Sequence, residues 1–283
     1  MIWQTSRFRI DLSVPIVMGI VNATPDSFSD GGLYYSSMDE LSGVLAHCEK
    51  LLSQGAGLLD IGGESTRPGA LPVPLAHELA RVLPVVRHAV TLGVPVSVDT
   101  YKPEVMQAVL DLGADIINDV WALRQPGALQ AVAAHARCGV CLMHMHREPQ
   151  TMQAAPMQGD AVAQVTQFLE QAASRLQACG VDKSRIVLDP GVGFGKTVAQ
   201  NFSLLARQRE LLAVGYPLLA GWSRKSSLAA VCGTLAGELP GRDERMAPSV
   251  AAAVLAVERG ARIVRVHDVR ETVQALKIWA AAS

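Results

Sequence analysis

The stretch PVSVDTYKPEVMQAVLDLGADIINDV, residues 95–120, decides the fold class. It begins with the apolar run PVSVDT (95–100) and ends with a second such run, DIINDV (115–120). Nearly continuous apolar runs of this length are typical of parallel strands that are covered on both faces. Between the two runs, Pro103 stands where the first turn of a helix would begin, a position that proline favours. The stretch therefore predicts a strand, a helix and a second, parallel strand.

The same alternation recurs along the chain. Segments such as 41–52 and 161–179 place their apolar residues on one helical stripe. We expect one (β/α)8 barrel, or TIM barrel, that forms a single domain over residues 1–283. A doubly wound sheet is the alternative, but a count of eight runs and the lack of a clear domain boundary favour the barrel. The eight runs are 16–22, 57–62, 95–100, 115–120, 139–145, 185–190, 217–223 and 262–268.

Composition excludes several classes of function. Hydrophobic residues make up 49% of the 283 residues and the net charge is −1, so electrostatics give no reason to expect nucleic acid or an anionic membrane as a partner. Without a long apolar run, no membrane span is expected. The N-terminus lacks the apolar core of a signal peptide, and five scattered cysteines fit a reducing compartment, so we expect a cytoplasmic protein.

Cysteines 138 and 141 form an isolated C-x-x-C pattern. The pattern could bind zinc or carry redox chemistry. However, no second pair follows, and Cys141 lies inside an apolar run. We interpret both residues as packed core cysteines.

Three predicted connections are longer than is usual between a strand and the following helix. They are ATPDSFSDGGLYYSS (23–37), GESTRPGALPVP (63–74) and HREPQTMQAAPMQG (146–159). All three follow the carboxyl ends of strands, where barrel enzymes place their active sites. We interpret a further long polar stretch, residues 233–248, as a solvated connection between helices.

Polar residues stand at or near the end of nearly every predicted strand. A single one could cap a helix or bond at the barrel mouth, but together they converge on one volume and predict a polar ligand site. They are Asn22, Asp60, Asp99, Asn118, His144, Asp189, Ser223, Arg265 and His267.

Arg265 and His267 should point to the same side of the last strand, because side chains alternate along a strand. A cation and an imidazole near the seventh and eighth strands suit a phosphate. The alternative for Arg265 is an ion pair with a neighbouring carboxylate such as Asp268. His144 and His146 could together bind a metal, although packing and loop hydrogen bonds are the preferred interpretation.

The run DPGVGFGKT (189–197) resembles a phosphate-binding P-loop but fails its spacing. Gly191 and Gly195 enclose three residues, where the P-loop needs four between its glycines. The dinucleotide pattern G-x-G-x-x-G fails as well, because the third glycine comes one residue early. We expect a tight loop that approaches a ligand.

With these motifs in place, the chain resembles the dihydropteroate synthases over about residues 14–280. The matching stretches occur in the order typical of that family: MGIVNATPDSFSDGG (18–32), LDIGGESTRPGA (59–70), SVDTYKPEV (97–105), INDV (117–120), MHMHREPQTMQ (143–153), LDPGVGFGKT (188–197), GWSRKSSL (221–228) and RVHD (265–268). The resemblance implies a pterin-binding barrel, usually a homodimer. It also implies an enzyme that joins p-aminobenzoate to 6-hydroxymethyl-7,8-dihydropterin diphosphate and releases pyrophosphate.

The resemblance also implies roles for individual residues. Asp99, Asn118, Asp189 and Lys225 would hold the pterin ring. Arg265 and His267 would hold the diphosphate, with Asn22 as a Mg²⁺ ligand and Asp60 nearby. The p-aminobenzoate would be surrounded by Thr66, Arg67, Pro68, Phe194 and Ser226, and the lid would comprise Asp26, Ser27, Phe28, Thr66, Arg67 and Pro68.

Three other functions remain open at this stage. A barrel methyltransferase could bind a methylated folate through the same pterin pocket, although it would not need Asn22, Arg67 or the Arg265–His267 pair. A relative without activity could bind pterin in a structural or regulatory role. A metal-dependent hydrolase built on His144 and His146 is the third.

Overall fold

The computed structural model describes residues 1–24, 38–66, 69–148, 150–152, 154–233, 239, 241 and 243–282. Eight parallel strands form one sheet in the order β8-β7-β6-β5-β4-β3-β10-β9. Their bounds are β3 (Ile16–Asn22), β4 (Leu58–Gly62), β5 (Val96–Asp99), β6 (Ile116–Asp119), β7 (Gly139–Met143), β8 (Ile186–Asp189), β9 (Leu219–Ala220) and β10 (Ile263–Val266).

The two ends of this sheet meet, which closes the barrel. Leu188 of β8 forms a parallel bridge with Leu218 beside β9. The Leu188 amide also donates to the carbonyl of Pro217 at 3.0 Å. The predicted (β/α)8 barrel is therefore confirmed.

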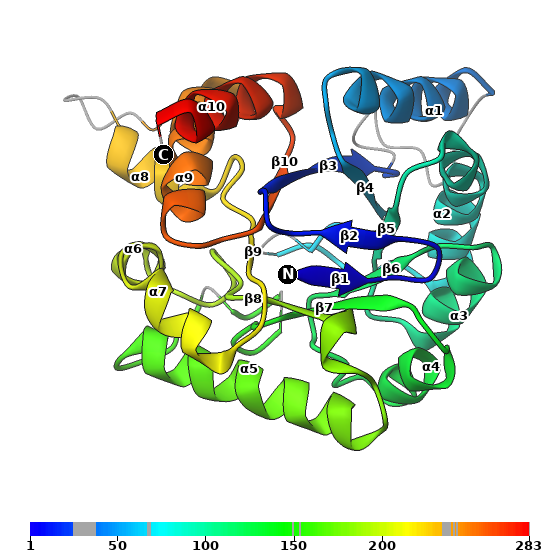
Figure 1. Cartoon of the computed structure of the whole chain (residues 1–283), viewed down its shortest axis with the longest axis horizontal. Helices are drawn as coiled ribbons and strands as arrows, with labels where there is room; N and C mark the ends of the chain where they lie inside the picture. The colour runs from blue at the N-terminus through cyan, green and yellow to red at the C-terminus, as the bar shows by residue number, and fades with distance from the viewer. Residues whose placement is uncertain are drawn as a thin grey trace.

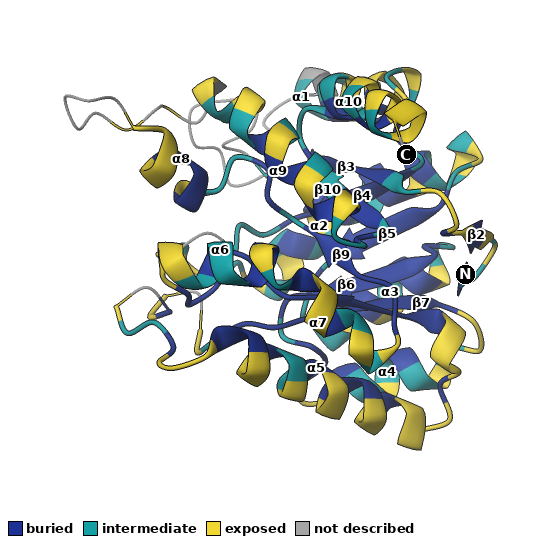
Figure 2. Ribbon diagram, turned by 60° about the vertical axis from the view of Figure 1, so that its left-hand side comes forward, coloured by how far each residue is buried: buried dark blue, intermediate teal, exposed yellow. Residues whose placement is uncertain are grey.

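Helices surround the barrel, as Figure 1 shows. Figure 2 shows the strands buried and the outward faces of the helices exposed, as the amphipathic pattern requires. The α-helices are α1 (Met38–Ser53), α2 (Leu75–Ala89), α3 (Pro103–Asp111), α4 (Ala128–Ala134), α5 (Ala161–Ala178), α6 (Val198–Ala206), α7 (Gln208–Leu211), α8 (Ser226–Cys232), α9 (Met246–Glu258) and α10 (Val269–Ala282). Short 3₁₀ helices are η2 (Val90–Leu92), η3 (Lys183–Arg185), η4 (Leu212–Val214) and η5 (Asp243–Arg245).

An N-terminal hairpin that the sequence pattern did not predict covers one end of the barrel (Figure 1). Its antiparallel strands are β1 (Ile2–Gln4) and β2 (Arg9–Asp11). Trp3 packs against the innermost apolar layer of the barrel, and its indole N–H donates to the carbonyl of Arg185 at 2.9 Å. The hairpin fills the amino-terminal end, so a ligand site must lie at the carboxyl ends of the strands.

The two cysteines of the C-x-x-C pattern are free and buried. Cys141 belongs to the same innermost layer as Trp3, and Cys138 packs in the larger core outside the sheet. The interpretation of both as core residues is confirmed. Among the helices of the described ranges, none combines the length and the apolar character needed to cross a membrane.

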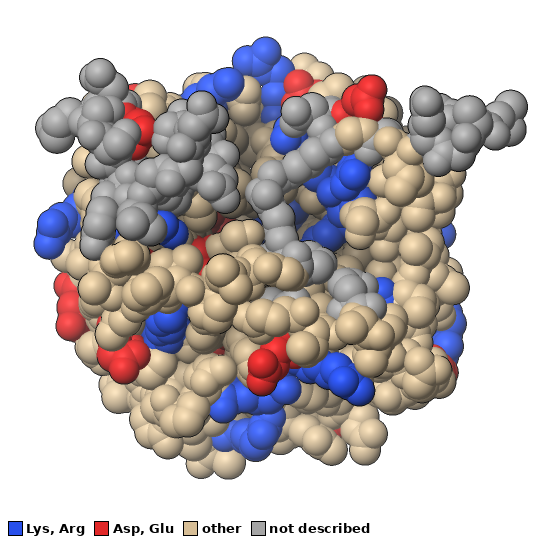
Figure 3. Space-filling model, turned by 180° about the vertical axis from the view of Figure 1, so that it is seen from behind, with Lys and Arg blue, Asp and Glu red and all other residues tan. Residues whose placement is uncertain are grey.

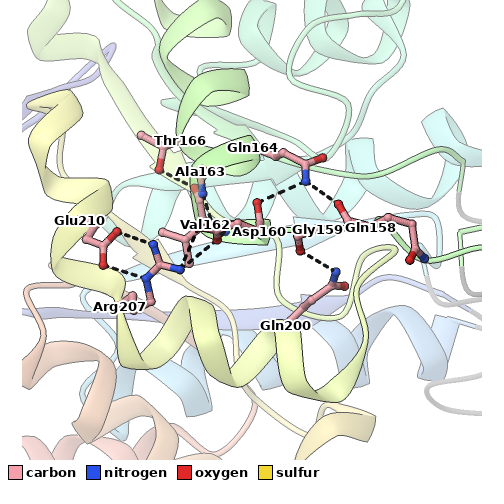
Figure 4. A network of polar contacts seen from close by, with 10 residues as sticks. All are labelled: Gln158, Gly159, Asp160, Val162, Ala163, Gln164, Thr166, Gln200, Arg207 and Glu210. Atoms are coloured by element: carbon pink, nitrogen blue, oxygen red, sulfur yellow. Dashed lines mark hydrogen bonds and ion pairs between the residues drawn. The ribbon is translucent and has the colours of Figure 1, made fainter.

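Polar contacts join the end of the loop that follows β7 to helices α6 and α7, as Figure 4 shows. Asp160 caps the N-terminus of α5 and pairs with Arg207 at 3.0 Å. Arg207 also pairs with Glu210 of α7, and Gln200 of α6 donates to the carbonyl of Met157 at 2.8 Å. The end of the loop that follows β7 is thus tied to α6 and α7.

Candidate active site

A cavity of about 310 Å³ opens at the carboxyl ends of the strands. Figure 3 views the molecule from this end and shows Lys and Arg side chains around a hollow. The cavity brings together eleven of the predicted site residues from seven different strands or the segments that follow them. They are Asn22, Thr66, Asp99, Asn118, Asp189, Phe194, Ser223, Lys225, Ser226, Arg265 and His267.

The remaining predicted residues are not among the described residues that line the cavity. The prediction that His144 joins the other polar residues there is wrong, because its ring packs against Phe168 and Lys196. Asp26, Ser27, Phe28, Arg67 and Pro68 lie outside the described residues, so their roles as lid and substrate contacts stay predictions. Asp60 is described, and its exposed fraction is 0%. It lies behind the residues that line the cavity, and its direct contact with a substrate also stays a prediction.

Asp60 organises the cavity wall through three hydrogen bonds. The Ser97 hydroxyl donates to Oδ1 at 2.6 Å, while the Asn118 amide and the Arg265 Nε donate to Oδ2 at 3.1 and 2.6 Å. The Asn118 amide nitrogen is thereby turned toward Asp60. Its carbonyl oxygen is left as an acceptor for a ligand.

Arg265 bridges two carboxylates from neighbouring strands. Besides Asp60, it donates through Nη2 to Asp99 Oδ2 at 2.9 Å. The alternative interpretation for Arg265, an ion pair with a carboxylate such as Asp268, is correct in kind but not in partner, because Asp268 pairs with Arg224 at 2.7 Å. The predicted phosphate contact of Arg265 must therefore be made by a guanidinium that already pairs with the buried Asp60 and the partly buried Asp99.

Burial perturbs the charged groups of the cavity. It raises the pKa of Asp99 to about 7, against the opposing effect of the Arg265 guanidinium. Burial also raises the pKa of Asp189, although the Gly191 amide donates to this carboxylate at 2.7 Å. In Lys225, burial lowers the pKa to about 8. A ligand that offers donors to the two carboxylates and an acceptor to Lys225 would replace the hydrogen bonds lost with water.

Lys225 and Phe194 lie against each other in the lining of the cavity. The Lys225 Nζ lies 4.2 Å from the centroid of the Phe194 ring. Gly193 faces the lysine stem, and a Cβ at that glycine would lie 3.2 Å from Lys225 Cδ. Both side chains line the cavity, so the ammonium and the exposed part of the phenyl ring can contact ligands bound there.

His267 is oriented by Ser223. The Ser223 Oγ accepts from the His267 backbone amide at 3.1 Å and lies 2.9 Å from the ring Nδ1. Both residues line the cavity next to Arg224 and Arg245. The lining thus contains the three guanidinium groups of Arg224, Arg245 and Arg265 besides the His267 imidazole. This set of groups favours an anionic ligand.

Asn22 ends β3 opposite Gly62 of β4 and lines the cavity. An amide oxygen is a hard ligand of the kind that Mg²⁺ accepts. Mg²⁺ in phosphate sites is usually held by one or two protein ligands together with the phosphates of the substrate. Within the described ranges, no group of three or more His, Cys, Asp or Glu side chains could hold a metal. A magnesium ion held by Asn22 together with a phosphorylated substrate stays a prediction.

Several lining residues were not predicted. Glu64 accepts from the Tyr101 hydroxyl at 2.8 Å and pairs with Lys102. It lies in the stretch GESTRPGA, so the motif contained the signal. Arg245 donates to the Arg224 carbonyl at 3.2 Å. Arg245 belongs to residues 233–248, and the interpretation of that stretch as only a solvated connection was wrong at this residue, because the start of α9 returns to the cavity.

The loop DPGVGFGKT and the two histidines pack together. Lys196 is buried and does not act as the lysine of a P-loop would. The His144 ring lies edge-on to Phe168, with centroids 4.9 Å apart, and its Nδ1 lies 2.8 Å from the Lys196 Nζ. These contacts support the packing interpretation of His144.

Comparison with known proteins gives a consistent result. The family model for pterin binding enzymes matches residues 18–267. The dihydropteroate synthase of Neisseria meningitidis serogroup C is 49% identical over 99% of this chain and 97% of its own length. The solved dihydropteroate synthase of Xanthomonas albilineans with 4-aminobenzoic acid is 47% identical, with a TM-score of 0.90 over 100% of this chain and 98% of that one. The Burkholderia cenocepacia enzyme complexed with 7,8-dihydropteroate is 49% identical, with a TM-score of 0.87 over 99% and 96%.

The family match covers most of the chain, and both the sequence and the barrel agree with these relatives over nearly their whole length. The chain therefore belongs to the pterin-binding enzymes and, within them, to the dihydropteroate synthases.

Proposed function

We propose that the chain is a transferase that joins p-aminobenzoate to 6-hydroxymethyl-7,8-dihydropterin diphosphate, giving 7,8-dihydropteroate and pyrophosphate. Relatives of high identity were solved with 4-aminobenzoic acid and with 7,8-dihydropteroate. The observation that carries the proposal is that Asp99, Asn118, Asp189 and Lys225 line one cavity although they come from four different parts of the barrel.

The pterin ring has a donor-rich edge, with an amino group and ring N–H groups, and one carbonyl oxygen. Asp99, Asp189 and the Asn118 carbonyl supply the acceptors, and Lys225 supplies a donor for the carbonyl or a ring nitrogen. Charge-assisted hydrogen bonds contribute roughly 1.5–3 kcal/mol each. Each contact is therefore expected to change pterin affinity by about tenfold or more.

The diphosphate is the leaving group, and neutralising its charge is the main catalytic task. Arg265 and His267 would lie along it, with Arg224 and Arg245 on the same side of the cavity. When bound, Mg²⁺ would neutralise the charge that develops on the departing diphosphate, with Asn22 as its protein ligand.

The bond between the pterin methylene carbon and the diphosphate oxygen breaks first, and its electron pair leaves with the oxygen. The resulting pterin cation is delocalised, and Asp99 and Asp189 stabilise its charge. The amine of p-aminobenzoate, held against Phe194 and beside Thr66 and Ser226, then forms the carbon–nitrogen bond and loses a proton. An arylamine is a weak nucleophile, and for this reason the cation forms before the amine attacks. A cation captures a neutral amine readily, so no strong general base is required.

Pyrophosphate release tests the proposal. The purified chain with Mg²⁺, dihydropterin diphosphate and p-aminobenzoate should release pyrophosphate and form dihydropteroate in equal amounts. Omission of p-aminobenzoate should stop dihydropteroate formation and reduce release to slow hydrolysis. Binding of the pterin without any condensation would instead favour a binding protein that has lost the activity.

We extend the proposal to a homodimer. On the face formed by α9 and α10, Leu255 and Ile278 are 43% and 73% exposed, and contact with a second copy would cover them. Light scattering should give twice the chain mass of 30.1 kDa, and a mass of 30.1 kDa would contradict the proposal.

A further inference from the structure

Lys196 is a buried lysine for which the proposed chemistry has no role. Its exposed fraction is 2%. The Nζ lies 2.8 Å from the Gly191 carbonyl, 3.2 Å from the Phe194 carbonyl and 2.8 Å from Nδ1 of His144. Two of these partners belong to the loop that follows β8, and the third belongs to the segment that follows β7.

The two segments also touch directly through their backbones. Gly191 and Gly195 both have positive φ, at 67° and 69°. A Cβ at Gly191 would lie 1.8 Å from the His144 carbonyl oxygen, and one at Gly195 would lie 2.6 Å from that of His146. These positions require glycine because two backbones meet there. The glycines allow the loop after β8 to approach the segment after β7, and the Lys196 amine forms hydrogen bonds to both segments.

We propose that Lys196 is a positioning residue whose amine joins the loop after β8 to the segment after β7 and so fixes Asp189 and Phe194 for the two substrates. Asp189 is held through its bond to the amide of Gly191, whose carbonyl accepts from Lys196. Phe194 is held through its own carbonyl. The inference rests on the proposed function, because it assigns Asp189 to the pterin and Phe194 to p-aminobenzoate.

The hydrogen-bond inventory is satisfied around the amine. An ammonium group has three N–H donors, and four acceptors lie around it: the two carbonyls, Nδ1 of a neutral His144 and, at 3.4 Å, the His144 carbonyl. Burial lowers the pKa of His144 to about 2, with Lys196, Arg124 and His146 acting in the same direction. Burial also lowers the pKa of Lys196 to about 7, with Lys225 acting in the same direction and Asp189 opposing it. A neutral amine would still donate to both carbonyls and could accept from a protonated Nδ1.

The test uses Lys196→Met in the full chain, because methionine keeps most of the apolar stem and removes the amine. The dissociation constant of dihydropterin diphosphate, measured by calorimetry, and KM for p-aminobenzoate should each rise about tenfold or more. The matched control is Lys183→Met, an exposed lysine of η3, for which both constants should stay within twofold of the wild type.

A folded Lys196→Met protein with both constants within twofold of the wild type would overturn the inference. If that variant does not fold, the protonation state of the His144 ring in the wild type is measured by ¹⁵N NMR as the pH is lowered. The His144 signal is assigned by its loss in His144→Phe. Burial alone lowers the pKa of His144, so a ring that stays neutral down to pH 5.5 meets a condition that the contact with Lys196 requires. A ring that protonates near its ordinary pKa of 6.5 rules it out. Absence of pterin binding by the wild type would instead contradict the proposed function, and the NMR result would still test the contact.

Discussion

Replacing Asp99 with asparagine should make the protein more stable and less able to bind pterin. Burial raises the pKa of Asp99 from 3.8 to about 7. Because each pKa unit corresponds to about 1.36 kcal/mol, the charged carboxylate opposes folding by roughly 4 kcal/mol at most. Asparagine keeps the shape of the side chain without its charge.

The pH dependence of this gain follows from the direction of the pKa change. The folded state holds a proton on Asp99 more tightly than the unfolded state, so the opposing free energy is absent below pH 4. It grows as the pH rises from about 4 to about 7 and is constant above that range. Asp99→Asn should therefore raise the unfolding free energy by about 2–4 kcal/mol at pH 8 and leave it nearly unchanged at pH 3.5.

Urea unfolding of the wild type and the variant at several pH values measures this difference. Asp111→Asn, at an exposed carboxylate that ends α3, is the control and should change the unfolding free energy by less than about 0.5 kcal/mol. A gain of equal size at pH 3.5 and pH 8, or a loss at pH 8, would show that the charge on Asp99 does not oppose folding. The same variant should bind dihydropterin diphosphate at least about tenfold more weakly.

Three further outcomes are expected. Arg265→Ala leaves Asp60 and Asp99 without their shared cation, so the unfolding free energy should fall by about 3–5 kcal/mol in urea, and a loss under about 1 kcal/mol would contradict the bridge. The value of kcat/KM should rise as Asp99 ionises near pH 7 and fall as Lys225 loses its proton near pH 8, whereas a flat profile from pH 6 to 9 would exclude both groups. Chelation by EDTA should abolish pyrophosphate release and added Mg²⁺ should restore it; full activity in EDTA would remove the metal from the proposal.

The barrel could be predicted because its eight strands are short, apolar and evenly interrupted by amphipathic segments. Pro103 marked the start of α3 correctly. The hairpin β1–β2 could not be predicted from the same pattern, since each of its strands has only three residues and its burial comes from Trp3 and its neighbours contacting the distant barrel floor. Long-range packing of this kind leaves no local periodicity.

The site residues that stand at the ends of strands could be predicted, because their place in the sequence fixes their place in the barrel. Asp99, Asn118 and Asp189 stand at or near the carboxyl ends of β5, β6 and β8, and closure of the barrel brings them to one cavity. The partner of Arg265 was not predictable, because Asp60 is 205 positions away in the sequence. The burial of Lys196 depends in the same way on contact between two loops.

A crystal structure of this chain with 7,8-dihydropteroate would locate both halves of the ligand. We expect the pterin ring within hydrogen-bond distance of Asp99, Asn118, Asp189 and Lys225, with the benzoate part against Phe194. A pterin bound elsewhere, or in this cavity without contact to those four side chains, would contradict this expectation.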